Sequence, residues 1–245
     1  MTKNRLDLQL LAKGLVKSRE EAKKLILAGE VSVNGHMNDK ASFKVSDADE
    51  LKIKERPKYV SRGGLKLEAA INQFNIPIKG KIGLDLGSST GGFTDCLLQF
   101  GAEKVYAFDV GTNQLAWKLR SDERVISREN FNCRNISKTD INDRVDIIVI
   151  DVSFISLEKI LVPACSILDG STDIICLIKP QFELKREQIG KGGIVKDPTL
   201  HTEAITKIES LGTHVLKMEH IGTMDSPIKG AAGNIEFLAY FRHNT

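Results

Sequence analysis

Short β-branched runs alternate with helical patterns through most of this chain, and that alternation limits its fold more than any other feature. Five runs of six or seven residues follow position 60: KIGLDL (81–86), KVYAFDV (104–110), RVISREN (124–130), DIIVID (146–151) and DIICLI (173–178). Helical patterns lie around residues 91–101, 113–120 and 157–168. Strands joined by crossover helices have this order, so we predict an α/β fold built on a doubly wound, mostly parallel sheet.

The end of the chain extends this pattern. Asp197-Pro198 combines an N-cap residue with proline at the first helical position, which predicts a helix to about Leu211. Two later runs, HVLKMEHI (214–221) and IEFLAYF (235–241), flank a glycine-rich loop. We expect them to be the last strands of the sheet.

Composition narrows the class of protein. The 245 residues are 41% hydrophobic and 27% charged, values typical of globular chains, which excludes fibrous and wholly disordered proteins. No apolar run approaches the roughly 18 to 20 residues of a membrane helix. The opening MTKNRLDLQLLAKG carries charges throughout and lacks the apolar segment of a secretory signal, so we expect a cytoplasmic protein. The cysteines and histidines show no ligand spacing, and we expect no metal site or disulfide framework.

The first 60 residues form a separate, basic region. They contain 13 Lys or Arg and 9 Asp or Glu, an excess of +4, while the remainder contains 22 and 23, a balance of −1. A broad apolar face predicts a first helix; it consists of Leu6, Leu8, Leu10, Leu11 and Leu15. Ser18 followed by Glu21 is a capping-box signal for a second helix, and Asn34-Gly35 predicts a β-hairpin.

A charged segment with a proline, KIKERPKYV, ends this region. We therefore expect a small α/β domain over residues 1–59 and a larger domain over 60–245. The candidate RNA-binding residues of the small domain are Arg5, Arg19, Lys23 and Lys24. Several cations on one rigid face can neutralise neighbouring phosphates, although a merely solvated basic face is the alternative.

The pattern of this region adds to its charge. RLDLQLLAKGLVKSREEAKKLILAGEVSVNG resembles the small RNA-binding domain first named for the fourth protein of the small ribosomal subunit. The resemblance rests on the leading R-L-D, the S-R-x-x-A helix and the G-x-V-x-V-N-G hairpin. It implies that the small domain binds RNA.

A candidate cofactor site follows the first strand of the larger domain. KIGLDL leads into Gly87-Ser88-Ser89-Thr90-Gly91-Gly92-Phe93 and then a helix, an arrangement in which backbone amides receive a ligand. The spacing D-x-G-x-x-x-G-G matches neither the dinucleotide G-x-G-x-x-G nor the P-loop. Asp109, at the end of the next strand, can accept hydrogen bonds from ribose hydroxyls. These features favour S-adenosylmethionine over NAD or ATP, while a tight turn that needs glycine only for its backbone is the alternative.

Charged residues end two further strands. Asp151 follows DIIVID and Lys179 follows DIICLI, so both lie at the carboxyl edge where open α/β sheets bind ligands. Lys66 and Glu236 complete a Lys-Asp-Lys-Glu set if the fold brings all four together, which sequence spacing alone cannot show.

Seven motifs over nearly the whole chain support one family. They are VSRGGLKL, DLGSSTGGFTD, DVSFISL, LIKPQFE, KGGIVKD, SPIKG and GNIEF. In this order they resemble the TlyA, or haemolysin A, family of ribosomal RNA 2′-O-methyltransferases, within the broader FtsJ-like group. The resemblance implies a Rossmann-like S-adenosylmethionine-dependent methyltransferase that acts on ribosomal RNA or ribosomal subunits.

The resemblance also implies residue roles. A catalytic tetrad is carried over to Lys66, Asp151, Lys179 and Glu236. The cofactor-binding motifs are carried over to Asp85, Gly87, Gly91 and Asp109, with Asn130 on the adenine side; Ser88, Gly92 and Phe93 belong to the same loop.

The expected chemistry explains the tetrad. A ribose hydroxyl is a poor nucleophile until its proton is withdrawn. An ordinary lysine has a pKa of about 10.4 and is protonated at neutral pH, but burial and a second nearby cation favour the neutral amine. We therefore expect Lys179 to act as the base beside Lys66, with Asp151 and Glu236 orienting the two lysines.

Three other functions fit parts of the sequence. A non-catalytic ribosome-assembly factor could use the same fold as an RNA-binding platform, although the tetrad candidates argue against it. A membrane-lysing toxin conflicts with the lack of a signal peptide and of a spanning segment. An amino-group methyltransferase should carry an Asn/Asp-Pro-Pro-aromatic motif where this chain has Asp151-Val152-Ser153-Phe154.

Overall fold

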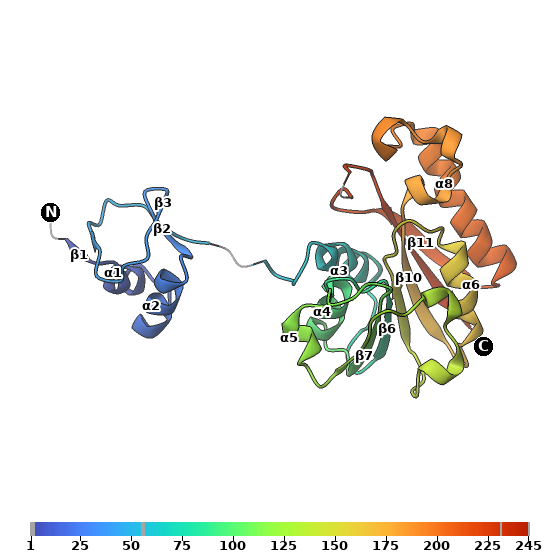
Figure 1. Ribbon diagram of the computed structural model, residues 1–245, viewed down its shortest axis with the longest axis horizontal. Helices are drawn as coiled ribbons and strands as arrows, with labels where there is room; N and C mark the ends of the chain where they lie inside the picture. Colours follow the sequence, from blue (N-terminus) through green and yellow to red (C-terminus); the bar gives the residue numbers. More distant parts are fainter. Residues whose placement is uncertain (1–2, 55–56, 231, 245) are drawn as a thin grey trace. The chain divides into compact units, whose positions relative to one another are not determined.

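The chain folds into two compact units, residues 1–56 and 57–245 (Figure 1). The structure, a computed structural model, describes residues 3–54, 57–230 and 232–244. Tyr59, which we expected at the end of the small domain, is instead buried in the core of the larger unit.

The smaller unit packs two helices on short strands. Its elements are β1 (Asn4–Arg5), α1 (Leu6–Ala12), α2 (Arg19–Leu27), β2 (Val31–Val33), β3 (His36–Met37), β4 (Lys44–Val45) and β5 (Leu51–Ile53). Strand β2 lies between β3 and β5, and β1 pairs with β4, all antiparallel. The core includes Leu6 and Leu10 of α1, Ala22 and Ile26 of α2, and Val31 of β2.

The local sequence signals of this unit act as predicted, with two exceptions. Ser18 Oγ accepts a hydrogen bond from Glu21 N at 3.1 Å and begins α2, while the Glu21 carboxylate accepts from Lys17 N and not from Ser18 N, so the capping box forms only in part. Asn34 and Gly35 both have positive φ, as a tight hairpin requires. The broad apolar face of the first helix is the second exception: Leu8, Leu11 and Leu15 are each about two-fifths exposed. Only one narrow stripe of α1 can face a core this small.

The larger unit is built on a seven-stranded sheet in the order β11-β12-β10-β9-β6-β7-β8. The strands are β6 (Ile82–Leu86), β7 (Lys104–Phe108), β8 (Val125–Arg128), β9 (Ile147–Ile150), β10 (Thr172–Ile178), β11 (Glu219–Asp225) and β12 (Phe237–His243). The first five are parallel, while β12 is antiparallel to both β10 and β11. The predicted α/β fold with a doubly wound, mostly parallel sheet is confirmed.

Helices cover both faces of this sheet, as Figure 1 shows. They are α3 (Gly63–Phe74), α4 (Gly92–Gln99), α5 (Trp117–Arg120), α6 (Glu158–Ser166), α7 (Pro180–Glu183) and α8 (Pro198–Ser210). One core contains side chains of α3, α4 and α5, and the other contains side chains of α6 and α8. Strands β9 and β10 are buried throughout because they lie between the two layers, which explains their unbroken apolar runs.

Two expected elements differ from the structure. Of the helix expected over 113–120, only α5 forms, because hydrogen bonds to Glu129 hold residues 113–115 in a loop. The strand expected over 214–221 begins at Glu219, and residues 211–215 form a π-helical turn that continues α8. The helix predicted from Asp197-Pro198 is confirmed, and Asp197 accepts a hydrogen bond from Thr199 N.

Candidate active site

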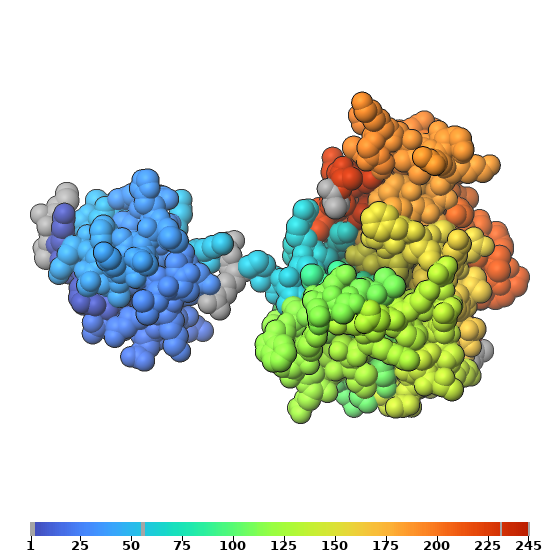
Figure 2. All heavy atoms as spheres, viewed as in Figure 1, coloured from blue at the N-terminus to red at the C-terminus, as the bar shows by residue number. Residues whose placement is uncertain are grey.

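Three of the predicted site residues lie at the carboxyl edge of the central strands. Strands β6, β9 and β10 are neighbours, and Gly87, Asp151 and Lys179 follow directly after their last residues. In Figure 2, atoms from widely separated parts of the sequence meet on one face of the larger unit. Parallel strand order therefore brings together residues that are far apart in the chain.

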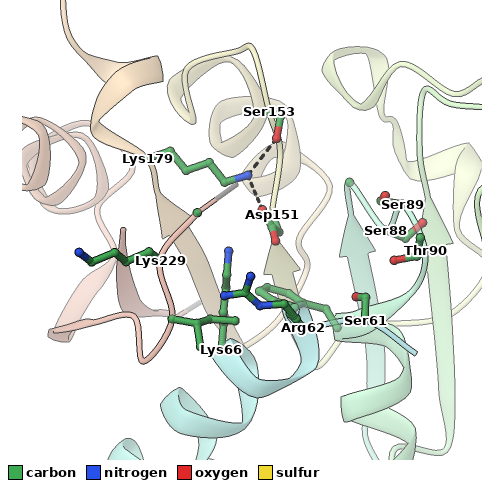
Figure 3. A pocket seen from close by; sticks show the side chains of 16 residues that line it. Ser61, Arg62, Lys66, Ser88, Ser89, Thr90, Asp151, Ser153, Lys179 and Lys229 are labelled. Atoms are coloured by element: carbon green, nitrogen blue, oxygen red, sulfur yellow. Dashed lines mark hydrogen bonds and ion pairs between the residues drawn. The ribbon is translucent and has the colours of Figure 1, made fainter. Parts of the chain in front are cut away.

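Lys179 is held by two groups from the segment after β9. Its Nζ lies 2.6 Å from Asp151 Oδ1 and donates a hydrogen bond to Ser153 Oγ at 3.0 Å (Figure 3). The Lys179 residue is only 8% exposed. Asp151 is more open, so the ammonium is neutralised on one side and faces a cavity on the other.

Lys66 and Glu236 form a second, more buried pair. Lys66 Nζ of α3 lies 2.6 Å from Glu236 Oε2, just before β12, and both residues are less than one-tenth exposed. Gly230 passes directly over this carboxylate, because a Cβ there would lie 2.2 Å from Glu236 Oε1. Any larger residue at 230 would displace the partner of Lys66.

A cavity of about 290 Å³ lies between these two pairs. Its charged lining residues are Arg62, Lys66, Asp151, Lys179 and Lys229. The four cations against one carboxylate make the cavity attractive to an anion. Hydroxyl side chains supply much of the remaining wall, including Ser61, Ser88, Ser89, Thr90 and Ser153.

The glycine loop after β6 approaches neighbouring backbone closely. Gly87 has φ +87°, and a Cβ there would lie 2.6 Å from the carbonyl oxygen of Asp151. Gly87 N and Ser88 N both donate to the carbonyl of Phe108. The loop is therefore anchored to β7 and pressed against the segment that carries Asp151.

Asp85 lies beneath this loop, and among the described residues only one of its two carboxylate oxygens has a hydrogen-bond partner. It is fully buried, and Oδ2 accepts a hydrogen bond from Thr94 Oγ1 at 2.6 Å. Within the described residues, Oδ1 has no hydrogen-bond partner. Burial raises the pKa of Asp85 to about 7. An unpaired buried carboxylate oxygen costs stability and indicates a site where a ligand or water supplies the donor.

Asp109 joins two loops at the end of β7. Oδ2 accepts from Ser89 N at 2.9 Å, and Oδ1 accepts from Gly111 N at 2.6 Å. Glu129 holds the rest of the second loop by accepting from the backbone N–H groups of Asn113, Gln114 and Leu115. These bonds keep residues 113–115 out of the helix expected over 113–120.

A second cavity of about 820 Å³ adjoins the first. The two cavities share Gly87, Ser89, Asp151 and Ser153 as lining residues. Asp109 lines the larger one, together with Phe131, Asn132, Cys133, Arg134, Val152 and Ile155, among others. A nucleoside-sized ligand in the larger cavity would therefore border the smaller cavity along those four residues.

The structure distributes the expected cofactor residues unevenly. Ser88, Gly92 and Phe93 line the smaller cavity, and Asp109 lines the larger one. Gly91 lines neither; a Cβ there would clash with Leu119, so its role is to let α5 pack closely. Asn130, expected on the adenine side, also lines neither cavity: its Oδ1 accepts from Thr112 Oγ1, and the next four residues form the wall instead.

Sequence reasoning missed several lining residues. Phe154 is 91% exposed with φ +63°, and its ring lies 5.2 Å from that of Phe182 between centroids. The side chains of Arg62 and Lys229 have no hydrogen bond or ion pair within the described part of the chain. Phe154 belongs to the motif DVSFISL and Arg62 to VSRGGLKL, so the motifs themselves were the available signal.

In the smaller unit, Asp7 organises two of the candidate RNA-binding residues. Its carboxylate is buried. Arg5 Nε donates to Oδ1 and Arg19 Nε donates to Oδ2, each at 2.9 Å. Burial alone would raise the pKa of Asp7, but these hydrogen bonds outweigh it and lower the pKa to about 2. Lys23 and Lys24 have no ion pair among the described residues.

Comparison with known proteins identifies the two regions of the chain. The model of the FtsJ-like methyltransferase matches residues 59–243, and that of the S4 domain matches residues 4–51. The chain belongs to the FtsJ-like methyltransferase family. The FtsJ-like region contains both cavities and both lysine–carboxylate pairs, and the S4 domain contains Asp7 with Arg5 and Arg19.

Several relatives share both regions with this FtsJ-like protein. It is 47% identical to hemolysin A of Brachyspira hyodysenteriae, over 97% of this chain and 99% of that protein. It is 41% identical to the 16S/23S rRNA (cytidine-2′-O)-methyltransferase TlyA of Mycobacterium tuberculosis, over 98% of this chain and 90% of that protein. A solved structure from Streptococcus thermophilus is 45% identical in sequence and has a TM-score of 0.75; the match covers 100% of this chain and 90% of that one. No helix in the described parts of the chain is long and apolar enough to cross a membrane.

Proposed function

We propose that this chain transfers a methyl group from S-adenosylmethionine to a ribose 2′-hydroxyl of ribosomal RNA. The observation that carries the proposal is that the two cavities share lining residues, one of which, Asp151, forms an ion pair with Lys179. The larger cavity suits the adenosyl ligand and the smaller, cationic one suits a ribose-phosphate acceptor. The name of the TlyA relative, which specifies a 2′-O position in rRNA, supports the same reaction.

The residues of the larger cavity fit an adenosyl ligand. Asp109 presents a carboxylate where ribose hydroxyls can donate to it. Asp85 lines neither cavity, but its Oδ1, unpaired among the described residues, lies two residues before Gly87 of the loop that the ligand would contact. Gly87 leaves room because a side chain there is sterically excluded. When bound, S-adenosylmethionine supplies a methyl group that its sulfonium already activates.

The residues of the smaller cavity then act on the acceptor. Lys179 Nζ accepts the proton of the 2′-hydroxyl, which makes the oxygen nucleophilic enough to receive the methyl group. Asp151 and Ser153 hold the Lys179 nitrogen in place and stabilise the ammonium it becomes. Lys66, positioned by Glu236, stabilises the negative charge that develops on the oxygen.

RNA is held by both units in this proposal. Arg62 and Lys229 face the phosphates beside the target ribose, and the exposed ring of Phe154 offers a surface for a base. Arg5, Arg19, Lys23 and Lys24 of the S4 domain contribute affinity through other phosphates. Because the substrate is ribosomal RNA, we place the reaction in the cytoplasm.

Mapping ribose methylation tests the proposal. Ribosomal RNA and isolated subunits from a strain without the gene should gain methyl groups at 2′-oxygens when incubated with the protein and S-adenosylmethionine. Methylation confined to a base, or none on any ribosomal substrate, would contradict the proposal.

A further inference from the structure

A buried carboxylate, Glu183, connects the two segments that carry the Lys179–Asp151 pair. Glu183 ends α7, one helical turn after Lys179, and its side chain is 1% exposed. Its Oε2 accepts a hydrogen bond from Ser156 Oγ at 2.6 Å, and its Oε1 accepts one from Leu157 N at 2.7 Å. Both donors belong to the segment that begins at Asp151.

Lys207 of α8 supplies the countercharge. Its Nζ lies 3.1 Å from Glu183 Oε2 and donates to the Glu183 carbonyl oxygen at 2.9 Å. A buried carboxylate without such a partner is strongly destabilising. The pair therefore secures α7 and the Ser156 hydroxyl to the helix layer behind them.

The segment over residues 151–157 is consequently held at both ends. Strand β9 fixes its start, and Glu183 fixes its end at Leu157, the N-cap of α6. Between these points it presents Asp151 and Ser153 to Lys179. Asp151 itself is fixed by β9 and by the hydrogen bond from its N to the Leu86 carbonyl oxygen, so release of the far end would let Ser153 and the Lys179 end of α7 move relative to it.

We propose that Glu183 is a positioning residue that keeps Asp151 and Ser153 on the amine of Lys179. The importance of that amine rests on the proposed methyltransferase function, whereas the positioning itself is a property of the fold. Glu183 accepts hydrogen bonds from three donors, whereas the NH₂ group of Gln would face the Lys207 ammonium in one orientation and the Leu157 amide N–H in the other, and neither can accept a hydrogen bond. Glu183→Gln keeps the volume and breaks the connection.

Two measurements test this proposal on the full-length protein. The first is the rate at which acetic anhydride acylates Lys179, followed by mass spectrometry across pH, which requires no methyltransferase activity. The second is kcat for ribose methylation at saturating RNA and S-adenosylmethionine. Glu187→Gln is the matched control, since it removes an exposed carboxylate from the next turn of the chain.

In Glu183→Gln we expect Lys179 to be acylated at least about threefold faster, because Asp151 and Ser153 no longer hold its nitrogen. We expect kcat to fall about tenfold or more, because the released amine is no longer aligned with the hydroxyl that it must deprotonate. The other charged residues that line this cavity, Arg62, Lys66 and Lys229, are unchanged in every variant. Glu187→Gln should match the wild type in both measurements.

Ser156→Ala provides a second test should Glu183→Gln fail to fold. It removes one hydrogen bond from the same carboxylate and should change Lys179 acylation in the same direction, by a smaller factor. Unchanged acylation in folded Glu183→Gln or in Ser156→Ala would overturn the positioning role. If the wild type methylates no ribose while acylation changes as expected, the proposed function fails and the positioning role stands.

Discussion

Lys179 and Asp151 meet across neighbouring parallel strands, with 2.6 Å between Nζ and Oδ1, and each is the first residue after its strand. The register of β9 and β10 pairs Ile150 with Cys176, so Lys179 continues past the end of its neighbour. Its side chain therefore reaches back over the strand end to Asp151.

Lys179→Arg should abolish methyl transfer. Arginine keeps the positive charge but remains protonated at any working pH, so it cannot accept the proton of the hydroxyl. Loss of a general base lowers kcat by roughly 10² to 10⁴-fold. Turnover of radiolabelled methyl groups into RNA measures this, with Lys138→Ala, an exposed lysine, as the control. Near wild-type turnover in Lys179→Arg would mean that the lysine acts only as a fixed charge.

Asp109→Ala should weaken S-adenosylmethionine binding by about tenfold or more, about 1.4 kcal/mol or more in binding free energy. The variant removes the carboxylate for the ribose and also releases Ser89 N and Gly111 N. Titration calorimetry measures the dissociation constant, with Glu123→Ala, a change at an exposed residue, as the control. Equal affinity in Asp109→Ala would remove this residue from the cofactor site.

The ionisation of Asp85 should lower the free energy of unfolding of the ligand-free protein as pH rises from about 4 to about 7. Its pKa is raised to about 7 in the folded state, so the folded state binds the proton more tightly than the unfolded state over this range. The loss should approach about 4 kcal/mol as an upper limit, since each pH unit contributes about 1.4 kcal/mol.

Asp85→Asn should remove that pH-dependent loss, because an amide does not ionise. Urea unfolding of both proteins at several pH values measures the difference, and Asp169→Asn provides a surface control. Parallel stability curves for the wild type and Asp85→Asn would contradict the prediction. We also expect weaker cofactor binding in Asp85→Asn, because the free carboxylate oxygen is lost.

Neutral substitutions in the S4 domain should weaken RNA binding and reduce its salt dependence. Lys23→Gln and Lys24→Gln are the clearest tests, because neither lysine has an ion pair among the described residues. Each lysine that neutralises a phosphate should, when replaced, reduce the salt slope by about one. Filter binding at several salt concentrations measures this, with Lys40→Gln as the control.

Arg5→Gln and Arg19→Gln should weaken RNA binding too, but they also leave Asp7 with fewer partners. The Asp7 carboxylate is buried, so these variants should loosen the S4 domain as well. Hydrogen exchange of its amides separates the two effects. Unchanged affinity and salt slope in all four variants would mean that the basic face is only solvated, and cofactor binding should survive in every case.

Local signals in the sequence determined the elements and their class. Alternating β-branched runs and helical patterns predicted the parallel sheet, Ser18 with Glu21 predicted the start of α2, and Asn34-Gly35 predicted the hairpin. These signals depend on neighbouring residues along the chain, which is why they can be read without the fold. The order of the motifs also indicated the family correctly.

Only the tertiary structure decided which side chains share a wall. Strand order brings Asp151 to Lys179, and the antiparallel insertion of β12 brings Glu236 to Lys66 on α3. The same packing leaves Asn130 outside both cavities, although its place after β8 resembles that of residues that line them. Contacts between distant segments depend on sheet order and on the burial of each layer. Neither is encoded in any short stretch of residues, so spacing could propose these partners but could not place them.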